Sequence, residues 1–348
     1  MEKIRLTEFS HGSGCGCKIA PAVLEEILKS DRINARFENL LVGYESRDDA
    51  AVMELNGSGQ CLISTVDFFT PIVDDPFHFG RIAAANALSD VYAMGGSPIL
   101  ATAILGLPVE KIPADVARQI IEGGRSICEE AGVPLAGGHS IDTLEPFFGL
   151  SVNGLVLKKN LKKNNTARVG DLLFLTKPLG TGIISSAMKR GKASEAHVNA
   201  SIELMSELNR VGEKLGAMEC VHAMTDVTGF GLLGHLTEMT EGSHCSATLE
   251  YKRIPLIPGI EIYMQQFIFP DNTYRNWNAY EKKVKGINGP EFIPLCDPQT
   301  SGGLLVAVDP SAEKDFIDLM MREKISCAAV PIGTMVPETD FRIEIITV

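Results

Sequence analysis

The chain has 348 residues, of which 45% are hydrophobic and 22% are charged, a composition that supports a sizeable buried core and argues against wholesale disorder. Its formal net charge of −12 at pH 7 is poorly matched to the phosphate backbone of DNA or RNA, so we expect no nucleic acid among its partners. A phosphate ligand remains compatible with this acidity, because Mg²⁺ can lie between carboxylates and phosphates.

No uninterrupted apolar run reaches the ~20 residues that span a bilayer, so we also expect no membrane partner. The chain begins MEKIRLTEFSHGSG, without the apolar segment of a secretory signal. Its eight cysteines are scattered, and most lie inside apolar stretches, a pattern typical of reduced thiols in a cytosol. These features predict a cytoplasmic protein.

The first predicted element is a flexible arm over residues 1–18, which contains the glycine-rich sequence HGSGCGCK. A short helix with one apolar face is expected from Pro21, and a β-branched, aromatic run predicts a buried strand over Cys61–Phe69. A long helix is expected over Phe77–Met94, because a pair of glycines follows it and supplies a stop.

A helix over Ala114–Ala131 and strands at Val133–Ala136 and Phe148–Leu157 complete the first half. The polar, basic segment Lys158–Asn165 predicts a solvated linker between two domains. The expected boundaries are a catalytic arm at 1–18, an N-terminal domain at 19–157, a linker at 158–168 and a C-terminal domain at 169–348.

The second half also alternates strands and helices. The expected elements are strands at Asp171–Thr176, Gly303–Val308, Ala328–Ile332 and Phe341–Ile346, and helices around Ala196–Leu215, Leu232–Thr240 and Ala312–Arg322. The segment Pro270–Gly289, rich in asparagine and charge, predicts a surface insertion. Because both halves alternate strands and helices, the predicted class is a two-domain α/β or α+β protein.

Five aspartates stand beside glycines or at the ends of predicted elements: Asp48 and Asp49 in SRDDAAV, Asp67 in STVDFF, Asp90 in NALSDVYAMGG and Asp226 in TDVTGFGLLGH. Mg²⁺ prefers oxygen ligands and keeps water, so a few carboxylates and phosphate oxygens suffice to bind it. Four of them also have an ordinary structural explanation. Asp48 and Asp49 could be turn residues, Asp90 an exposed helix residue and Asp226 a helix N-cap. Together they predict a metal and nucleotide site.

Asp67 is the most informative of the set, because an aspartate directly after β-branched residues needs a partner. Asn86 and Asp90 are four residues apart on a predicted helix and should share one face. Glycine-rich turns, which can gather backbone N–H groups around an anion, are expected at 137–140, 180–182, 229–231 and 301–303. None of them has P-loop or Rossmann spacing, and ordinary turns account for most glycines.

The arm carries two thiols and an ammonium group, Cys15, Cys17 and Lys18. A nearby cation favours the thiolate, which is the better nucleophile or chalcogen ligand, and Lys18 can also neutralise phosphate charge. A zinc site built from the cysteines and His11 is the alternative, but the sequence lacks a second closely spaced pair of ligands.

With HGSGCGCK added to the motifs SRDDAAV, STVDFF, NALSDVYAMGG, GGHSI, TDVTGFGLLGH and DPQTSGGLL, the sequence resembles the selenophosphate synthetases (selenide, water dikinases). The resemblance runs from about Leu6 to the C-terminus. The aspartate and glycine motifs alone would indicate only the wider superfamily of aminoimidazole ribonucleotide synthetase-like proteins, whereas the N-terminal motif is specific to the synthetases.

The resemblance implies two-domain α/β subunits, paired as a homodimer whose N-terminal sheets join into a barrel, and a reaction of ATP, selenide and water that yields selenophosphate, AMP and orthophosphate. It implies Mg²⁺ as cofactor and leaves room for a selenide-delivering protein. By motif, the implied catalytic residues are Cys15 and Lys18, and the implied metal ligands are Asp49, Asp90 and Asp226. The implied nucleotide contacts are Lys18, Ser46, Arg47, Asp48, Asp67, Asp90, Gly137, Gly138 and His139.

Two other functions fit parts of the pattern. A small-molecule kinase or ATP-driven cyclase of the same superfamily would release ADP and would not require Cys15 and Lys18 in an arm. A non-catalytic selenium or metal carrier could use Cys15 and Cys17, but it would leave the aspartates without a role.

Overall fold

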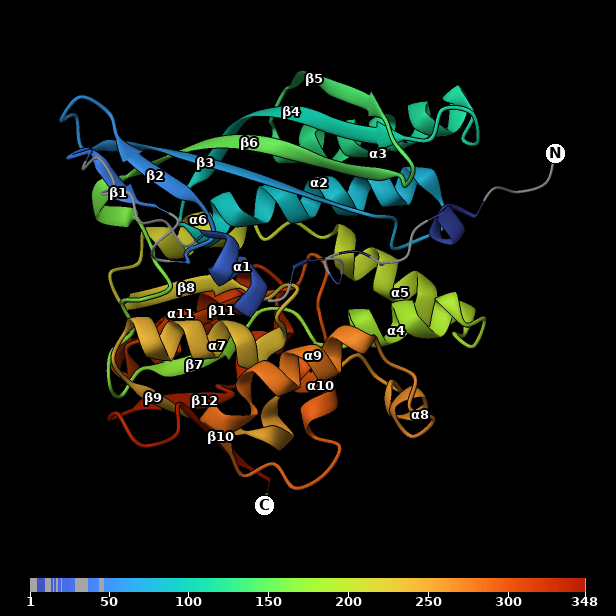
Figure 1. Cartoon of the computed structure of the whole chain (residues 1–348). Helices are drawn as coiled ribbons and strands as arrows, with labels where there is room; N and C mark the ends of the chain where they lie inside the picture. The colour runs from blue at the N-terminus through green and yellow to red at the C-terminus, as the bar shows by residue number, and fades with distance from the viewer. Residues whose placement is uncertain are drawn as a thin grey trace.

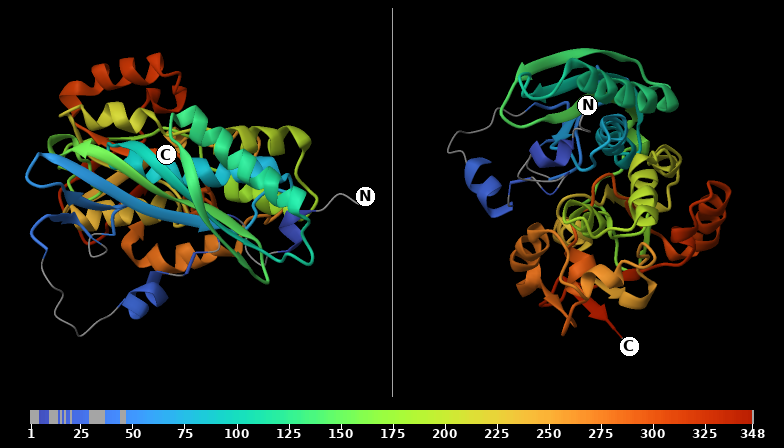
Figure 2. Two further views of the ribbon diagram at one scale, coloured as in Figure 1. Left: turned by 90° about the horizontal axis from the view of Figure 1, so that it is seen from above. Right: turned by 90° about the vertical axis from the view of Figure 1, so that its right-hand side faces the viewer.

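The computed structural model describes residues 5–9, 14, 16, 18–19, 21–28, 37–43 and 47–347. These residues form two α/β halves that are stacked on one another, with the long helix α2 between the two sheets (Figures 1 and 2). Among the described helices, none combines the length and apolar character that a bilayer span demands.

The N-terminal half is built on a sheet of six described strands in the order β1-β2-β3-β6-β4-β5. The strands are β1 (Leu40–Val42), β2 (Ala51–Glu54), β3 (Gln60–Phe69), β4 (Ser97–Leu107), β5 (Leu135–Asp142) and β6 (Phe147–Leu157). All neighbours are antiparallel except β4 and β5, which are parallel. In β3 the buried residues alternate with exposed ones, so one face of the strand points at α2.

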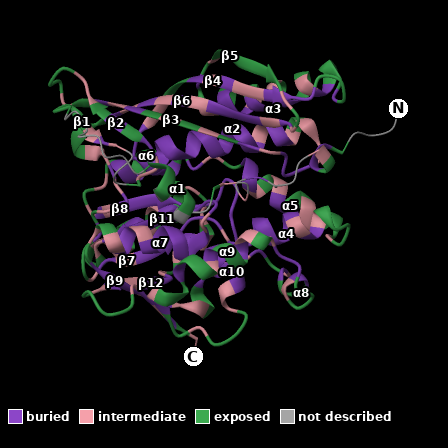
Figure 3. Ribbon diagram, viewed as in Figure 1, coloured by how far each residue is buried: buried purple, intermediate pink, exposed green. Residues whose placement is uncertain are grey.

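Helices α2 (Pro76–Ala93) and α3 (Ala114–Ala131) cover one face of this sheet, while α1 (Pro21–Leu28) is a short separate helix (Figure 1). Helix α2 begins where Asp75 accepts a hydrogen bond from the backbone N–H of His78 (2.8 Å). Its second half is buried on all sides (Figure 3), because the sheet, α3 and the C-terminal half enclose it.

The two helices pack closely because glycines face each other across the contact. A Cβ on Gly80 would lie 1.9 Å from the carbonyl oxygen of Ile120, and one on Gly123 would lie 2.0 Å from that of Phe77. Only glycine fits at these two positions without a shift of the backbone.

The C-terminal half is built on a sheet of seven described strands in the order β10-β13-β9-β12-β7-β11-β8. They are β7 (Leu172–Leu175), β8 (Val221–Asp226), β9 (Ser246–Glu250), β10 (Val284–Lys285), β11 (Leu304–Val308), β12 (Gly333–Val336) and β13 (Ile343–Ile346). Only the pairs β10–β13 and β13–β9 of these described strands are parallel. Strand β11 is buried on both faces, as its continuous apolar sequence requires.

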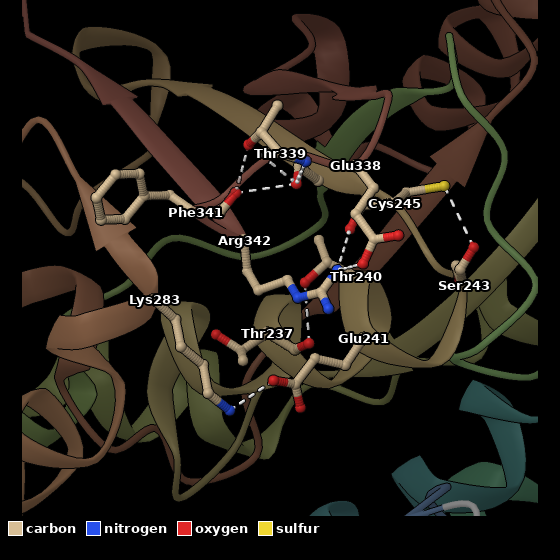
Figure 4. Close-up of polar contacts among 11 residues, drawn as sticks. Thr237, Thr240, Glu241, Ser243, Cys245, Lys283, Glu338, Thr339, Phe341 and Arg342 are labelled. Carbon is tan, nitrogen blue, oxygen red and sulfur yellow. Dashed lines mark hydrogen bonds and ion pairs between the residues drawn. The ribbon is translucent and has the colours of Figure 1, made fainter.

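The helices of this half lie on both sides of its sheet. They are α4 (Thr181–Lys189), α5 (Glu195–Ser206), α6 (Val211–Gly216), α7 (Gly231–Gly242), α8 (Glu261–Met264), α9 (Asp271–Tyr280), α10 (Phe292–Cys296) and α11 (Glu313–Arg322). Near the C-terminal edge of the sheet, ion pairs join Lys283 to Glu241 and Arg342 to Glu338, both at 2.5 Å (Figure 4). Such partly exposed pairs stabilise the fold by only ~0–1 kcal/mol each.

Some expectations from the sequence are wrong. The segment Lys158–Asn165 is solvated only at its start, where Lys158 and Lys159 are exposed. Lys162 and Asn164 are buried, and the Lys162 ammonium donates to the carbonyls of Met218 and Val221 (2.8 Å each). The residues Ser326–Ala329 form a 3₁₀ turn, so the strand expected at Ala328–Ile332 begins only at Gly333, as β12.

The segment Pro270–Gly289 is not a surface insertion either. It forms α9, whose Thr273, Asn276 and Tyr280 are buried. The Asn276 amide donates to the carbonyls of Gly229 and Cys296 (3.0 Å each) and so fixes α9 to the body of the C-terminal half.

Candidate functional site

The first pair of site residues joins β3 to α2. Asp67 lies on the face of β3 that points at α2, where the Asn86 amide donates to its Oδ2 (2.9 Å). The ammonium group of Lys18 lies 3.4 Å from the same oxygen. The sequence prediction that Asp67 needs a partner is confirmed, since Asn86 and Lys18 both contact it.

Asp90 lies on α2, one turn after Asn86. Its Oδ2 accepts a hydrogen bond from the hydroxyl of Thr65 (2.5 Å), a residue on the same face of β3 as Asp67. Asn86 and Asp90 therefore share a face, as predicted. Asp90 is buried, which excludes the alternative of an exposed helix residue.

Asp226 brings the C-terminal half to the site. It ends β8, and its Oδ2 accepts from the hydroxyl of Ser89 on α2 (2.6 Å). The Asn209 amide donates to Ser89 Oγ and to the carbonyl of Gly302 (2.8 Å each), so a buried hydrogen-bond chain links the halves. Helix α7 begins only at Gly231 without a side-chain cap, so Asp226 is not its N-cap.

Asp48 and Asp49 lie just before β2. Asp49 Oδ1 accepts from the hydroxyl of Thr225 (2.9 Å), and Asp48 Oδ1 accepts from the backbone N–H of Asn164 (3.1 Å). The Asn164 side chain also donates to the carbonyl of Arg47 (2.8 Å). The second oxygens of both carboxyl groups are buried and have no hydrogen-bond partner within the part of the chain that is described.

Burial and mutual repulsion disfavour charge on these carboxyl groups. Burial raises the pKa of Asp49 well above its ordinary value, and the neighbouring Asp226, Asp48 and Asp90 raise it further. The pKa of Asp90 is raised by burial and then by Asp226 and Asp67. Burial also raises the pKa values of Asp48 and Asp226 to about 6. Buried like charges of this kind require cations to remain ionised near neutral pH.

The cluster is suited to a hydrated cation rather than a protein-enclosed one. Within the described residues, no three His, Cys, Asp or Glu side chains converge closely enough to hold one ion. Mg²⁺ binds through one or two carboxylates and completes its shell with water and phosphate oxygens, so it does not need three. The partnerless oxygens of Asp48 and Asp49 fit such an ion.

Some predicted site residues are not brought to this cluster. Gly137, Gly138 and His139 were expected in a turn, but they lie inside β5, an exposed edge strand separated from β3 by β6 and β4. Strands are spaced ~4.8 Å apart, so within one chain they stand roughly 14 Å from β3. Cys15 and Ser46 lie outside the described residues.

The sequence did not indicate the hydroxyl and amide groups that hold the aspartates. Thr65, Ser89 and Thr225 each donate to one carboxylate, and Asn209 supports Ser89. The available signal was adjacency, since Ser89 precedes Asp90 and Thr225 precedes Asp226. Ser89, however, binds Asp226 and Thr225 binds Asp49, which no local pattern reveals.

Comparison with known families defines the class of protein. Residues 47–156 match the N-terminal domain of AIR synthase related proteins, and residues 168–346 match their C-terminal domain. The thiamine monophosphate kinase from Aquifex aeolicus shares the fold, with a TM-score of 0.66 and 16% identity over 93% of this chain and 94% of that one. The hydrogenase maturation protein HypE in complex with ATP does so with a TM-score of 0.61 and 19% identity over 84% of this chain and 81% of that one.

Much more similar proteins narrow the class. A selenide, water dikinase from Aeromonas hydrophila subsp. hydrophila is 51% identical over 97% of each chain, and one from Bordetella bronchiseptica is 51% identical over 99% of each. One from Pseudomonas putida is 50% identical, again over 99% of each chain. The chain therefore belongs to the selenide, water dikinase family of two-domain α/β AIR synthase related proteins.

Proposed function

We propose that this chain catalyses the ATP-dependent synthesis of selenophosphate from selenide and water, with release of AMP and orthophosphate. The observation that carries the proposal is the convergence of buried carboxyl groups from both halves beside Lys18. Sequence identity of 51% to selenide, water dikinases over nearly the whole chain supports it.

Asp49, Asp90 and Asp226 would between them hold one or more Mg²⁺ ions, each through one or two carboxylates. These ions would neutralise the charge of a triphosphate that could not otherwise enter an acidic site. The side chains that donate to these aspartates orient them for this role. Ser89 and Thr225 leave one oxygen of Asp226 and of Asp49 available to a cation. The segment Ser46-Arg47-Asp48 would contact the nucleotide beside them.

The protein's own part in phosphoryl transfer is to position groups and balance charge. Lys18 would act as a point donor to the phosphates, and Asp67, itself held by Asn86, positions Lys18. The γ-phosphorus forms a bond to selenium as its bond to the bridging oxygen breaks, which leaves ADP. Water then cleaves ADP to AMP and orthophosphate. Cys15, in the same arm, would hold selenium for the first transfer.

A homodimer would complete the assembly. The sheet of the N-terminal half exposes apolar side chains on strands β3, β4 and β5, including Val66, Phe68, Ile99 and Ile141. Pairing of two such sheets into a barrel would cover this surface. It would also allow β5 of one chain, with Gly137, Gly138 and His139, to approach the nucleotide of the other.

The proposal also includes the location of the protein, its domain boundaries and the supply of selenide. The protein would act in the cytoplasm, where selenide stays reduced, with the domain boundaries expected from the sequence. A selenide-delivering protein would supply the acceptor.

Product analysis of ATP turnover tests the proposal. With Mg²⁺ and selenide under anaerobic conditions, we expect AMP and orthophosphate to accumulate in equal amounts, in a selenide-dependent manner. Release of ADP as the final nucleotide would instead indicate the small-molecule kinase or cyclase, and selenide binding without any ATP turnover would indicate the carrier.

A further inference from the structure

A polar cavity lies outside the aspartate cluster, between α4 and the start of α9. Its volume is about 430 Å³, within the range of roughly 300–1,000 Å³ that small-molecule sites occupy. The walls come from α4, the start of α9 and Pro298 and Thr300 of the loop before β11, and Gly16 of the arm lines it too. The proposed reaction assigns no role to this cavity.

The cavity is basic in an acidic protein. Lys189 and Arg190 line it at the end of α4 and Arg275 lines it from α9, whereas Asp271 is its one acidic residue among those described. The net charge of its lining is thus +2, from three cations and one anion, against −12 for the whole chain. Two guanidinium groups present planar forks that match the oxygens of an oxyanion.

The same wall leads towards the reactive arm. Asn272 donates through its side-chain amide to the carbonyl of Gly16. Asn272 and Arg275 also line a smaller neighbouring cavity that contains Lys18. Asn276 fixes α9, and with it this wall, to the body of the fold. The basic cavity and Lys18 are therefore connected by adjacent side chains of one helix.

We propose that this cavity binds a small oxyanion of the phosphate class, and that in turnover it holds the orthophosphate that leaves the site. Only the second half of this statement rests on the proposed function. A selenide ion has no oxygens for the guanidinium forks, so the lining favours an oxyanion.

Direct binding of inorganic phosphate to the full chain tests the site itself. The titration is made without Mg²⁺, so that the acidic cluster repels phosphate. We expect saturable binding that sulfate competes for, and a loss of at least about tenfold in affinity in each of Arg190→Gln and Arg275→Gln, because each removes a charged hydrogen-bond donor.

Arg322→Gln is the matched control, since Arg322 lines another cavity, in which Asp315 and Asp318 balance the charges of Arg322 and Lys214. It should bind phosphate as the wild type does. Equal phosphate affinity in Arg190→Gln and the wild type, or an equal loss in Arg322→Gln, would overturn the proposed site. Because this readout involves no turnover, it is independent of whether selenophosphate is formed.

The role in turnover is tested by product inhibition. Orthophosphate should inhibit the wild type, and Arg190→Gln should raise its inhibition constant about tenfold while leaving the KM for ATP unchanged. If orthophosphate binds the cavity but inhibits both proteins equally, the role in product release is refuted.

Discussion

Asp226 ends β8 but contacts α2, and its position shows how one carboxyl group can serve both halves of the molecule. We expect Asp226→Asn to keep the fold, since the amide has the same shape and Ser89 can still bind it. Magnesium-dependent ATP binding should weaken by about 10–100-fold, the usual cost of a disturbed metal site. Calorimetric titration of ATP at several Mg²⁺ concentrations measures this, and an unchanged Mg²⁺ dependence would remove Asp226 from the metal site.

The same residue makes stability depend on pH in the absence of metal. Burial raises the pKa of Asp226 to about 6, whereas an unfolded aspartate titrates near ~3.9. The native state therefore binds more protons between these values, and the stability that this group contributes below about pH 4 is lost as the pH rises through about 6.

We expect Asp226→Asn to gain ~1–3 kcal/mol in free energy of unfolding relative to the wild type as the pH rises from about 4.5 to 7.5 without Mg²⁺. Urea denaturation of both proteins across that range measures the difference. Parallel pH profiles would contradict a shifted carboxyl group at this position.

At Cys15 the prediction rests on the sequence alone. Cys15→Ser should abolish selenophosphate formation and leave magnesium–ATP binding within about twofold, because a thiolate is a far better selenium ligand than a hydroxyl. Cys17→Ser is the matched control and should retain turnover, as we assign that thiol no necessary role. Wild-type turnover in Cys15→Ser would refute a required thiol.

At the scale of elements, the long helices followed from the sequence more fully than the strands did, although the helix expected around Ala196–Leu215 is divided into α5 and α6. The helical pattern placed α3 at its observed bounds. It placed α2, where a pair of glycines also marked the end, within one residue at each end. Strand β5 was partly missed, because its glycines resemble a turn and its extended form depends on pairing with β4. Strands β8 and β9 were missed for the same reason, since sheet partners distant in sequence decide them.

The residues of the site were also predictable only in part. The aspartates were predictable, because carboxyl groups beside glycines at element ends are chemically unusual. Their hydrogen-bond partners were not, since Ser89 and Asp226 are separated by 137 positions and meet only in the folded chain. The buried state of Asn164 was equally hidden, because its polar neighbours resemble a linker.

The packing of α2 on α3 gives a prediction at this scale. Gly123→Ala would place a methyl group against the carbonyl of Phe77 and should destabilise the protein by about 1–3 kcal/mol or more. Urea denaturation measures the loss. Gln119→Ala, at an exposed position of the same helix, is the control and should change stability by less than ~0.5 kcal/mol. Equal stabilities of the two variants would contradict close helix packing.

For the whole molecule, the exposed apolar face of the N-terminal sheet predicts an oligomer. Val66 and Phe68 are 54% and 47% exposed on β3. Replacing both with glutamate should convert a homodimer to a monomer in light scattering, because charge at the centre of an apolar interface is costly. Phe267→Glu, at a 71% exposed position of the C-terminal half, should not. An unchanged mass in the double variant would place the interface elsewhere.

Carboxyl groups from both halves and the lysine-bearing arm would together direct the γ-phosphoryl group of ATP to selenium. Anaerobic phosphorus NMR of the protein with ATP, Mg²⁺ and selenide tests it most directly. We predict a phosphorus signal coupled to selenium that grows together with AMP and orthophosphate and requires Lys18. ATP consumption without any phosphorus–selenium signal would rule out phosphoryl transfer to selenium.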